Sequence, residues 1–131
     1  MKNIQTSGKR KRAIARATLK SGEGKITVNG MAIDRIAPEL LRLKMLAPFY
    51  LAGDAAKKIN IDILVNGGAV SSRADAASVA IAKALAQHSE KLESVFLSYD
   101  RKLMVSDARR REQRKPNCRG KARSKRQKSY R

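Results

Sequence analysis

The last 23 residues carry the most distinctive chemistry of the chain, because they combine many cations with very few apolar side chains. Between Arg109 and Arg131 there are twelve Lys or Arg residues and one acid, Glu112. Such a segment cannot bury enough apolar surface to offset the entropy of ordering it, so we expect it to be disordered in isolation. Positive charge spaced along an extended path matches a nucleic-acid phosphate backbone. The segment is therefore predicted to contact RNA or DNA.

The formal net charge of +19 is concentrated at the two ends of the chain. Residues 1–20 hold seven basic side chains and no acidic one, whereas residues 21–108 hold eleven basic and ten acidic side chains. This asymmetry predicts a nearly neutral folded body with two phosphate-seeking ends. We expect residues 1–108 to form one globular domain and residues 109–131 to form an extended basic tail.

A second basic motif, Gly8-Lys-Arg-Lys-Arg12, lies near the N-terminus. It lacks the Lys-Ser/Thr pair and the strand-to-helix context of a nucleotide-binding loop, which argues against nucleotide hydrolysis. We expect a basic loop that leads into the first strand and contacts phosphates. The alternative is a solvated run of charge. Arg16, on the polar face of that strand, would extend the contact surface.

Residue types that support catalysis or metal binding are sparse. One histidine, His88, and one cysteine, Cys118, cannot supply the roughly four clustered ligands of a zinc site. His88 ends an apolar helix stripe and is expected to be structural. Gly67-Gly68 with Ser71-Ser72 could bind an anion at a helix N-terminus, but ending a strand and capping a helix is the favoured role. We expect no enzyme, no cofactor, no metal and no small-molecule substrate.

The sequence also indicates a location. No apolar stretch approaches the roughly 20 residues of a membrane span, and no signal-peptide segment is visible. A membrane-surface role would call for an amphipathic helix or lipidation site beside the basic cluster, and we find neither. We expect a cytoplasmic protein without a membrane partner.

The first half of the chain supplies elements that must position these cations. Alternation of apolar and polar side chains predicts a strand over 13–20, and a turn at Ser21–Gly24 leads to a second strand over 25–28. These two strands are expected to form a hairpin. A helix is expected over 34–47, with Pro48 ending it.

The second half predicts one further strand and two helices. The strand is expected over 59–65, where Ile and Val alternate with polar residues. A long helix is expected over 73–88, with a narrow stripe of small residues suited to packing on a sheet. A short helix should follow over 90–99. The order predicts an α+β fold, in which helices pack on a small mixed sheet.

Aromatic residues are too few to suggest base stacking as the main recognition mode. The expected strands carry none, and the chain has only Phe49, Tyr50, Phe96, Tyr99 and Tyr130. A sheet that binds single strands normally displays aromatics on its surface. Recognition is therefore expected to rest on backbone charge and RNA shape.

Several motifs together resemble the small-subunit ribosomal protein S9 family over nearly the whole chain. They are Gly8-Lys-Arg-Lys-Arg-Ala-Ile-Ala-Arg-Ala17, Gly22-x-Gly24, Val28-Asn-Gly30, Val65-Asn-Gly-Gly68, Ile81-Ala-Lys-Ala-Leu85, Tyr99-Asp-Arg101, Asp107-Ala-Arg-Arg110 and Lys125-Arg-Gln-Lys-Ser-Tyr-Arg131. The final motif is similar to the archaeal or eukaryotic type, and the short length favours the archaeal one.

The resemblance implies a sheet backed by helices with a left-handed β-α-β crossover. It also implies a place in the subunit head, on small-subunit ribosomal RNA and beside neighbouring ribosomal proteins. The tail would reach P-site tRNA through Lys128, Ser129, Tyr130 and Arg131. Ribosomal RNA contacts are expected from Lys9, Arg10, Lys11, Arg12, Arg16, Arg109, Arg110, Arg111, Arg114, Lys115, Arg119, Lys121, Arg123, Lys125 and Arg126.

The chain departs from the family pattern in two places. Ser72-Arg73 stands where the family commonly has Gly-Gln, and Tyr130 stands where the bacterial form has Lys.

Two other functions fit parts of the sequence. Composition alone would allow a DNA-condensing protein, and an enzyme could use His88 or the Gly67-Gly68 turn. The specific motifs favour the ribosomal interpretation.

Overall fold

The fold is α+β, with a five-stranded mixed sheet backed by helices. The computed structural model describes residues 3–118, 122 and 123. The strands are β1 (Ile4–Arg10), β2 (Ala13–Ser21), β3 (Ile26–Val28), β4 (Met31–Ala32) and β5 (Ile59–Asn66). The α-helices are α1 (Glu39–Ala52), α2 (Val70–His88) and α3 (Lys91–Tyr99), and short 3-10 turns are η1 (Ile33–Arg35), η2 (Gly53–Lys58) and η3 (Arg101–Leu103).

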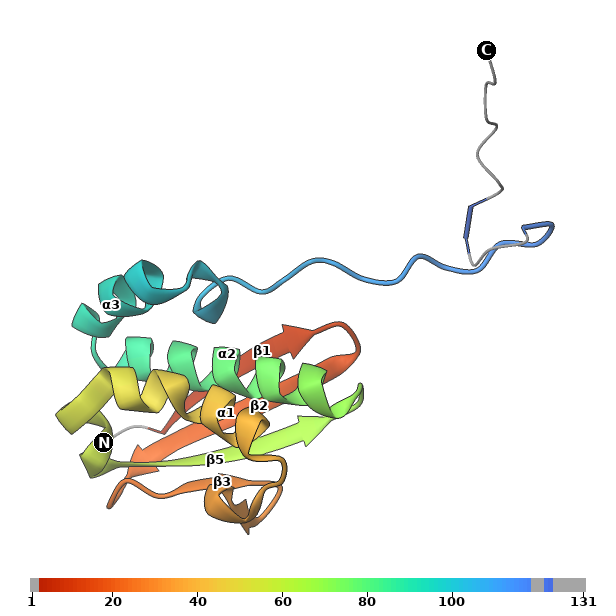
Figure 1. The fold of residues 1–131 in the computed structure, drawn as a ribbon. Coiled ribbons are helices and arrows are strands. Elements are labelled where there is room, and N and C mark those ends of the chain that lie inside the picture. The colour runs from red at the N-terminus through yellow and green to blue at the C-terminus, as the bar shows by residue number, and fades with distance from the viewer. Residues whose placement is uncertain (1–2, 119–121, 124–131) are drawn as a thin grey trace.

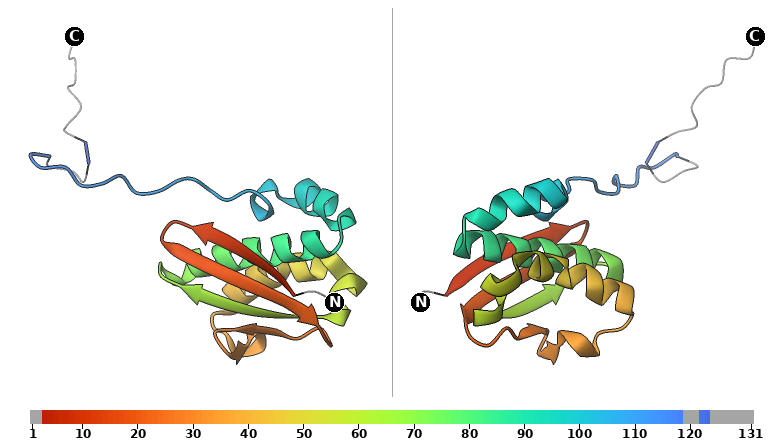
Figure 2. Two further views of the ribbon diagram at one scale, coloured as in Figure 1. Left: turned by 180° about the vertical axis from the view of Figure 1, so that it is seen from behind. Right: turned by 60° about the vertical axis from the view of Figure 1, so that its left-hand side comes forward.

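The sheet has helices on one face only. Its strand order is β1-β2-β5-β3-β4, and β3 and β5 are the parallel pair. The three α-helices lie on the same side of the sheet (Figure 1). From behind, the other face is not covered by any helix of the described chain (Figure 2). The core therefore lies between the sheet and α2.

Strands β2 and β5 show the alternation predicted from the sequence. Ala13, Ala15, Ala17 and Leu19 are at most 1% exposed, whereas Arg16 lies on the opposite, exposed face. In β5 the Ile and Val residues are buried and the residues between them are not. Both strands could be predicted from the sequence because every second residue is buried. One face of each strand lies in the core and the other lies in solvent.

Helix α2 lies at the centre of the fold. Its predicted stripe is buried, since Ala77, Ala80 and Leu85 are 0% exposed. Ala82 and Ala86, on other sides of the helix, are buried as well. This wider burial arises because α1 and α3 also pack on α2 (Figure 1). The small side chains let neighbouring backbones approach α2 closely.

The first strand was not expected from the sequence. Residues predicted as a basic loop, Gly8 to Arg10, belong instead to β1, and Lys11-Arg12 forms the turn into β2. The inner face of β1 carries Ile4, Thr6, Gly8 and Arg10, so only its first residue supplies the apolar side chain that marks a strand. Thr6 Oγ1 donates a hydrogen bond to the carbonyl oxygen of Ala80 at 2.8 Å. Polar and backbone contacts thus replace apolar burial here.

The hairpin predicted from β2 and β3 is wrong. Both strands exist, but β2 pairs with β1 and β5, and β3 pairs with β4 and β5. Strand β5 therefore lies between them. A turn signal in sequence shows that the chain bends, but it does not show which strand pairs with which.

The bounds of α1 also differ from the prediction. The helix begins at Glu39, while Asp34 lies in the preceding 3-10 turn η1. It continues through Pro48 to Ala52. Pro48 lacks the N–H that would bond back to the preceding turn. Both Pro48 and Ala52 are buried in the core, so tertiary packing overrides this local signal.

The contact between β1 and α2 gives a direct test of the packing. A Cβ atom at Gly8 would lie 2.1 Å from the carbonyl oxygen of Ala76 and 2.7 Å from the amide nitrogen of Ala80. We expect Gly8→Ala to lower the free energy of unfolding by about 1 to 3 kcal/mol or more, because two backbones must separate. Thermal and urea denaturation would measure this. Ser7→Ala, on the exposed face of the same strand, is the control, and equal stability of both variants would contradict the packing.

Candidate nucleic-acid interface

A cleft of about 1050 Å³ lies where the segment after η3 passes the β1–β2 turn and the β5–α2 loop. Six cations and one acid line it: Lys11, Arg12, Arg109, Arg110, Arg111, Arg114 and Glu112. Gly68, Ala69, Ser72 and Gln113 complete the lining. We call this feature the basic cleft. It brings together cations from both ends of the chain that the sequence predicted as phosphate contacts.

Two glycines position one wall of the basic cleft. Gly67 and Gly68 have φ angles of 72° and 68°, which favour glycine. A Cβ at Gly67 would lie 2.6 Å from the carbonyl oxygen of Arg12, and one at Gly68 would lie 2.8 Å from the amide nitrogen of Ala13. The β5–α2 loop can therefore lie directly against the β1–β2 turn. These close approaches support a structural role for the glycine pair, which the sequence analysis favoured over anion binding.

The capping role predicted for Ser71-Ser72 is wrong. Helix α2 begins at Val70, its N-cap is Ala69, and no side chain caps it. Ser72 is instead buried inside the helix, with 7% of its surface exposed. Arg73, at a position that departs from the family pattern, donates from Nε to the carbonyl oxygen of Gly67 at 3.0 Å. That contact ties the first turn of α2 to the glycine loop.

Arg10 occupies a different environment from the neighbouring cations. Its Nε atom lies 3.5 Å from an oxygen of Asp75, and its Nη1 atom lies 3.0 Å from Oδ2 of Asp107. The Nη1 contact is ionic but is not aligned as a hydrogen bond. Lys44 of α1 also contacts Asp75. The side chain of Arg10 is only 18% exposed, so its guanidinium faces carboxylates of the body.

Asp107 binds Arg109 as well as Arg10. Its Oδ1 atom accepts the backbone N–H of Arg109 at 2.9 Å, and Oδ2 accepts Nε and Nη2 at 3.0 and 2.6 Å. The hydrogen bonds from the Arg109 side chain hold the pKa of the Asp107 carboxyl well below its usual range. The Arg109 backbone N–H and the charges of Arg10 and Arg109 act in the same direction.

A second ion pair joins two parts of the tail. Arg123 donates to Glu112 through Nη2 at 2.5 Å and Nε at 3.1 Å. This hydrogen-bonded pair lowers the pKa of the Glu112 carboxyl. The chain turns between them at Asn117, which has a φ angle of 59°. Arg123 is thus paired with the one acid of the tail rather than displayed alone.

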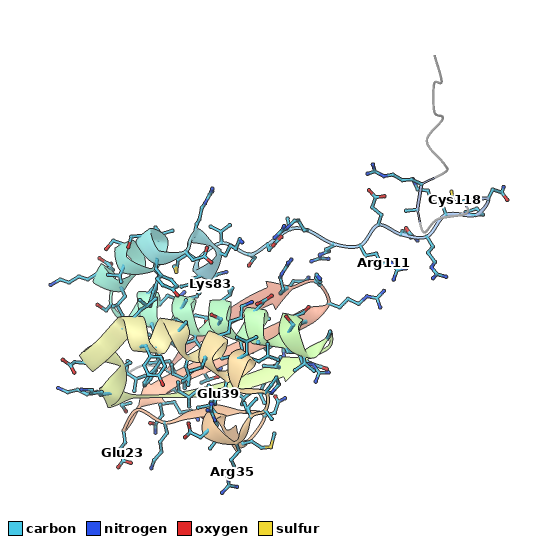
Figure 3. The ribbon with its side chains drawn as sticks, in the orientation of Figure 1. Glu23, Arg35, Glu39, Lys83, Arg111 and Cys118 are labelled. Carbon is cyan, nitrogen blue, oxygen red and sulfur yellow. The ribbon has the colours of Figure 1, made fainter. Side chains whose placement is uncertain are left out.

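The other predicted contacts differ in whether they belong to the exposed tail segment, to the strands or to residues outside the described part of the chain. Arg110, Arg111, Arg114 and Lys115 are exposed on a segment that leaves the body without helix or strand (Figure 3). Lys9 and Arg16 are exposed on strands β1 and β2, outside the basic cleft. Eight predicted residues lie outside the described part of the chain: Arg119, Lys121, Lys125, Arg126, Lys128, Ser129, Tyr130 and Arg131.

Other kinds of site are not seen in the part of the chain that the structure describes. No three His, Cys, Asp or Glu residues among residues 3–118, 122 and 123 gather as a metal site would require. His88 is half-buried at the end of α2. Within the same described residues, no helix is both long and apolar enough to span a membrane.

Comparison with known proteins identifies the family. The profile of ribosomal protein S9/S16 matches residues 8–131. Small ribosomal subunit protein uS9 of Methanococcus maripaludis strain C7 is 48% identical over 134 aligned positions, which cover all of both chains. The protein of the same name from Methanococcus vannielii is 46% identical with the same coverage. The chain belongs to the ribosomal protein S9/S16 family.

Several of the motifs that resemble the family lie at sterically or electrostatically constrained positions of the fold. Gly8 lies where β1 meets α2, and Gly67-Gly68 lies where the loop meets the β1–β2 turn. Asp107-Ala-Arg109 lies at the base of the tail. The relatives support the archaeal type of the family, and their names are those of ribosomal proteins.

The ionic contacts of Asp107 predict how its carboxyl titrates. In an NMR pH titration, its carboxyl carbon should show a midpoint well below the value of about 3.9 for an unperturbed Asp. Because the folded-state pKa is the lower one, the contribution to stability is present above the unfolded-state pKa and is lost as pH falls through the folded-state pKa. Arg109→Gln should move the midpoint back up. A midpoint near 3.9 in the unmodified protein would contradict these contacts.

Proposed function

We propose that this ribosomal protein is a structural constituent of the small subunit and binds ribosomal RNA in the subunit head. The observation that carries the proposal is the basic cleft, which gathers six cations from the two ends of the chain. Its relatives are named as proteins of the small ribosomal subunit. Their full-length similarity supports a shared role.

The electrostatics of the basic cleft support a polyanion as its occupant. Like charges that line one cleft repel each other, and phosphates that enter it relieve this repulsion and release counterions. Glu112, the one acid in the lining, is already paired with Arg123. The occupant is therefore expected to be a backbone rather than a neutral or cationic ligand.

Backbone charge and shape are expected to dominate recognition. The described strands carry no aromatic side chain on which bases could stack. Contacts to phosphate and sugar fix position and orientation but do not read base identity. The surrounding RNA fold would then select the binding site. This mode suits a protein that stabilises one folded ribosomal RNA.

A free DNA-condensing protein is the second function that composition allows. Family membership and the names of the relatives favour the ribosome. Sedimentation in sucrose gradients at moderate salt separates the two functions. The protein should travel with small subunits, whereas a DNA-condensing protein would leave them.

We further propose that the end of the tail contacts P-site tRNA through Lys128, Ser129, Tyr130 and Arg131. The resemblance of the Lys125–Arg131 motif to the family supports this role. Arg131 brings a permanently charged guanidinium that can pair with a phosphate. Tyr130 could place its ring against a ribose or base and donate its hydroxyl to a phosphate oxygen, which contributes about 1 kcal/mol.

The first prediction concerns salt dependence. If the basic cleft and tail engage about 6 to 10 phosphates, the logarithm of affinity for head ribosomal RNA should fall with the logarithm of salt at a slope of roughly −5 to −9. Removal of residues 109–131 should flatten the slope substantially. The double variant Lys11→Gln/Arg12→Gln should flatten it by about two, because each cation accounts for about one phosphate.

The matched control is Lys57→Gln/Lys58→Gln. It also removes two cations, but at the opposite end of β5 from the basic cleft. Its slope should stay close to that of the unmodified protein. Equal slopes for the two double variants would mean that net charge, rather than the basic cleft, determines binding.

The second prediction concerns the tail end. Deletion of Tyr130 and Arg131 should leave subunit assembly intact but weaken P-site tRNA binding by about three- to tenfold, which corresponds to a net loss of about 1 kcal/mol. Filter binding with several different tRNAs to reconstituted subunits would measure this. The loss should be similar for every anticodon, because backbone contacts do not read bases. Unchanged affinity, or a loss confined to one anticodon, would overturn the proposal.

A further inference from the structure

We propose that Asp107 is a positioning residue, which fixes the direction in which the tail leaves the body by holding Arg10 and Arg109 together. The inference rests on the proposed RNA-binding function and deepens it. It assigns Arg10 to the organisation of the interface, where the sequence had suggested a direct phosphate contact. We call the contacts of Arg10, Asp107 and Arg109 the tail latch.

The tail latch connects several elements of the fold. Asp107 follows η3, Arg10 ends β1, and Arg10 also contacts Asp75 of α2. Lys44 of α1 adds a further cation to this row of alternating charges, because it contacts Asp75. The base of the tail is thus tied by charge to a strand and, through Asp75, to two helices of the body.

The geometry of Asp107 differs from that of an ordinary surface ion pair. Its side chain is 15% exposed, the lowest value for any carboxylate in the ion pairs of the described residues. One oxygen accepts the backbone N–H of Arg109, which bends the chain locally, and the other binds both guanidinium groups. A charge-assisted contact that combines side-chain and backbone hydrogen bonds holds direction better than a single exposed lysine pair, even though Arg109 itself is 74% exposed.

The position of the tail latch relates it to the basic cleft. Arg10 directly precedes Lys11-Arg12, which form one wall, and Arg109 directly precedes Arg110 and Arg111 of the other wall. The latch therefore joins the two walls at the point where both begin. Without the tail latch, repulsion between the cations of the two walls would favour a wider separation of the walls. One RNA strand could then not contact both walls.

Two explanations of Asp107 predict opposite effects on RNA affinity. If Asp107 only moderates the local charge, its removal should strengthen RNA binding, because the net positive charge rises. If it positions the tail, Asp107→Asn should weaken binding to head ribosomal RNA despite the gain in charge. Binding weakens because the two walls must then be ordered during association, at a cost in affinity.

The experiment uses the full-length protein and three variants. Asp107→Asn removes the carboxylate, while Arg10→Lys keeps the charge but loses the fork that reaches both Asp75 and Asp107. Glu93→Gln is the charge-matched control, since Glu93 lies exposed on α3. Amide dispersion in NMR spectra would verify that each variant folds. Nitrogen-15 relaxation without RNA and affinity for head ribosomal RNA are then measured.

In the unmodified protein and in Glu93→Gln, the amides of residues 107–109 should be as rigid as those of η3. In Asp107→Asn and Arg10→Lys they should show fast motion, and RNA affinity should fall about three- to tenfold, as expected when a segment must be ordered on binding. Glu93→Gln should bind equally well or slightly more tightly.

The proposal is overturned if the relaxation of residues 107–109 does not change, or if Asp107→Asn binds RNA as Glu93→Gln does. The relaxation data are obtained without RNA. They therefore report on the tail latch even if the unmodified protein fails to bind head ribosomal RNA, a result that would refute the proposed function itself.

Discussion

The close contact between β1 and α2 is the constraint on which the interface depends. Gly8 allows the two backbones to meet, and the hydrogen bond from Thr6 to the carbonyl of Ala80 holds them in register. Because β1 is held in this position, Arg10 at its end reaches Asp75 and Asp107. The turn that follows then lies against the glycine loop. Close backbone packing at Gly8 thus determines where the cations of the N-terminal end are placed.

The acidic residues of the interface hold particular cations in place more than they neutralise its positive charge. Residues 21–108 carry ten acids and eleven bases, so the body adds little to the net charge of +19. Asp75 and Asp107 hold Arg10, and Glu112 holds Arg123. Each of these carboxylates orients one or two cations, and many other Lys and Arg side chains stay exposed. A basic protein can therefore keep a defined shape although its cations repel each other.

The sequence predicted those elements in which burial alternates cleanly. Strand β5 and helix α2 were found because core and solvent faces differ in residue type, and the cations of the basic cleft were identified by charge. Strand β1 was missed because Thr6, Gly8 and Arg10 face the helix without an apolar period. Pairing was wrong because no local pattern reports that β5 lies between β2 and β3. Asp107 was noted only as part of a family motif, and its contacts were missed because a lone acid beside a basic segment resembles ordinary surface charge. An Asp side chain that bonds to the backbone two residues later is nevertheless a usable signal for a local turn.

A partly ordered base reconciles the composition of the tail with a specific function. Ordering each residue costs roughly 1–2 kcal/mol, so a segment of 23 residues fixed in advance would need a core that its composition does not provide. A fully disordered segment would instead lose much of its binding energy to ordering when RNA binds. The contacts of Asp107 to Arg10 and Arg109 fix only the first few residues of the tail. They determine the direction of the chain at a low cost in conformational entropy. In the proposed complex, the base of the tail would supply direction, and the remaining cations would be ordered along the RNA backbone.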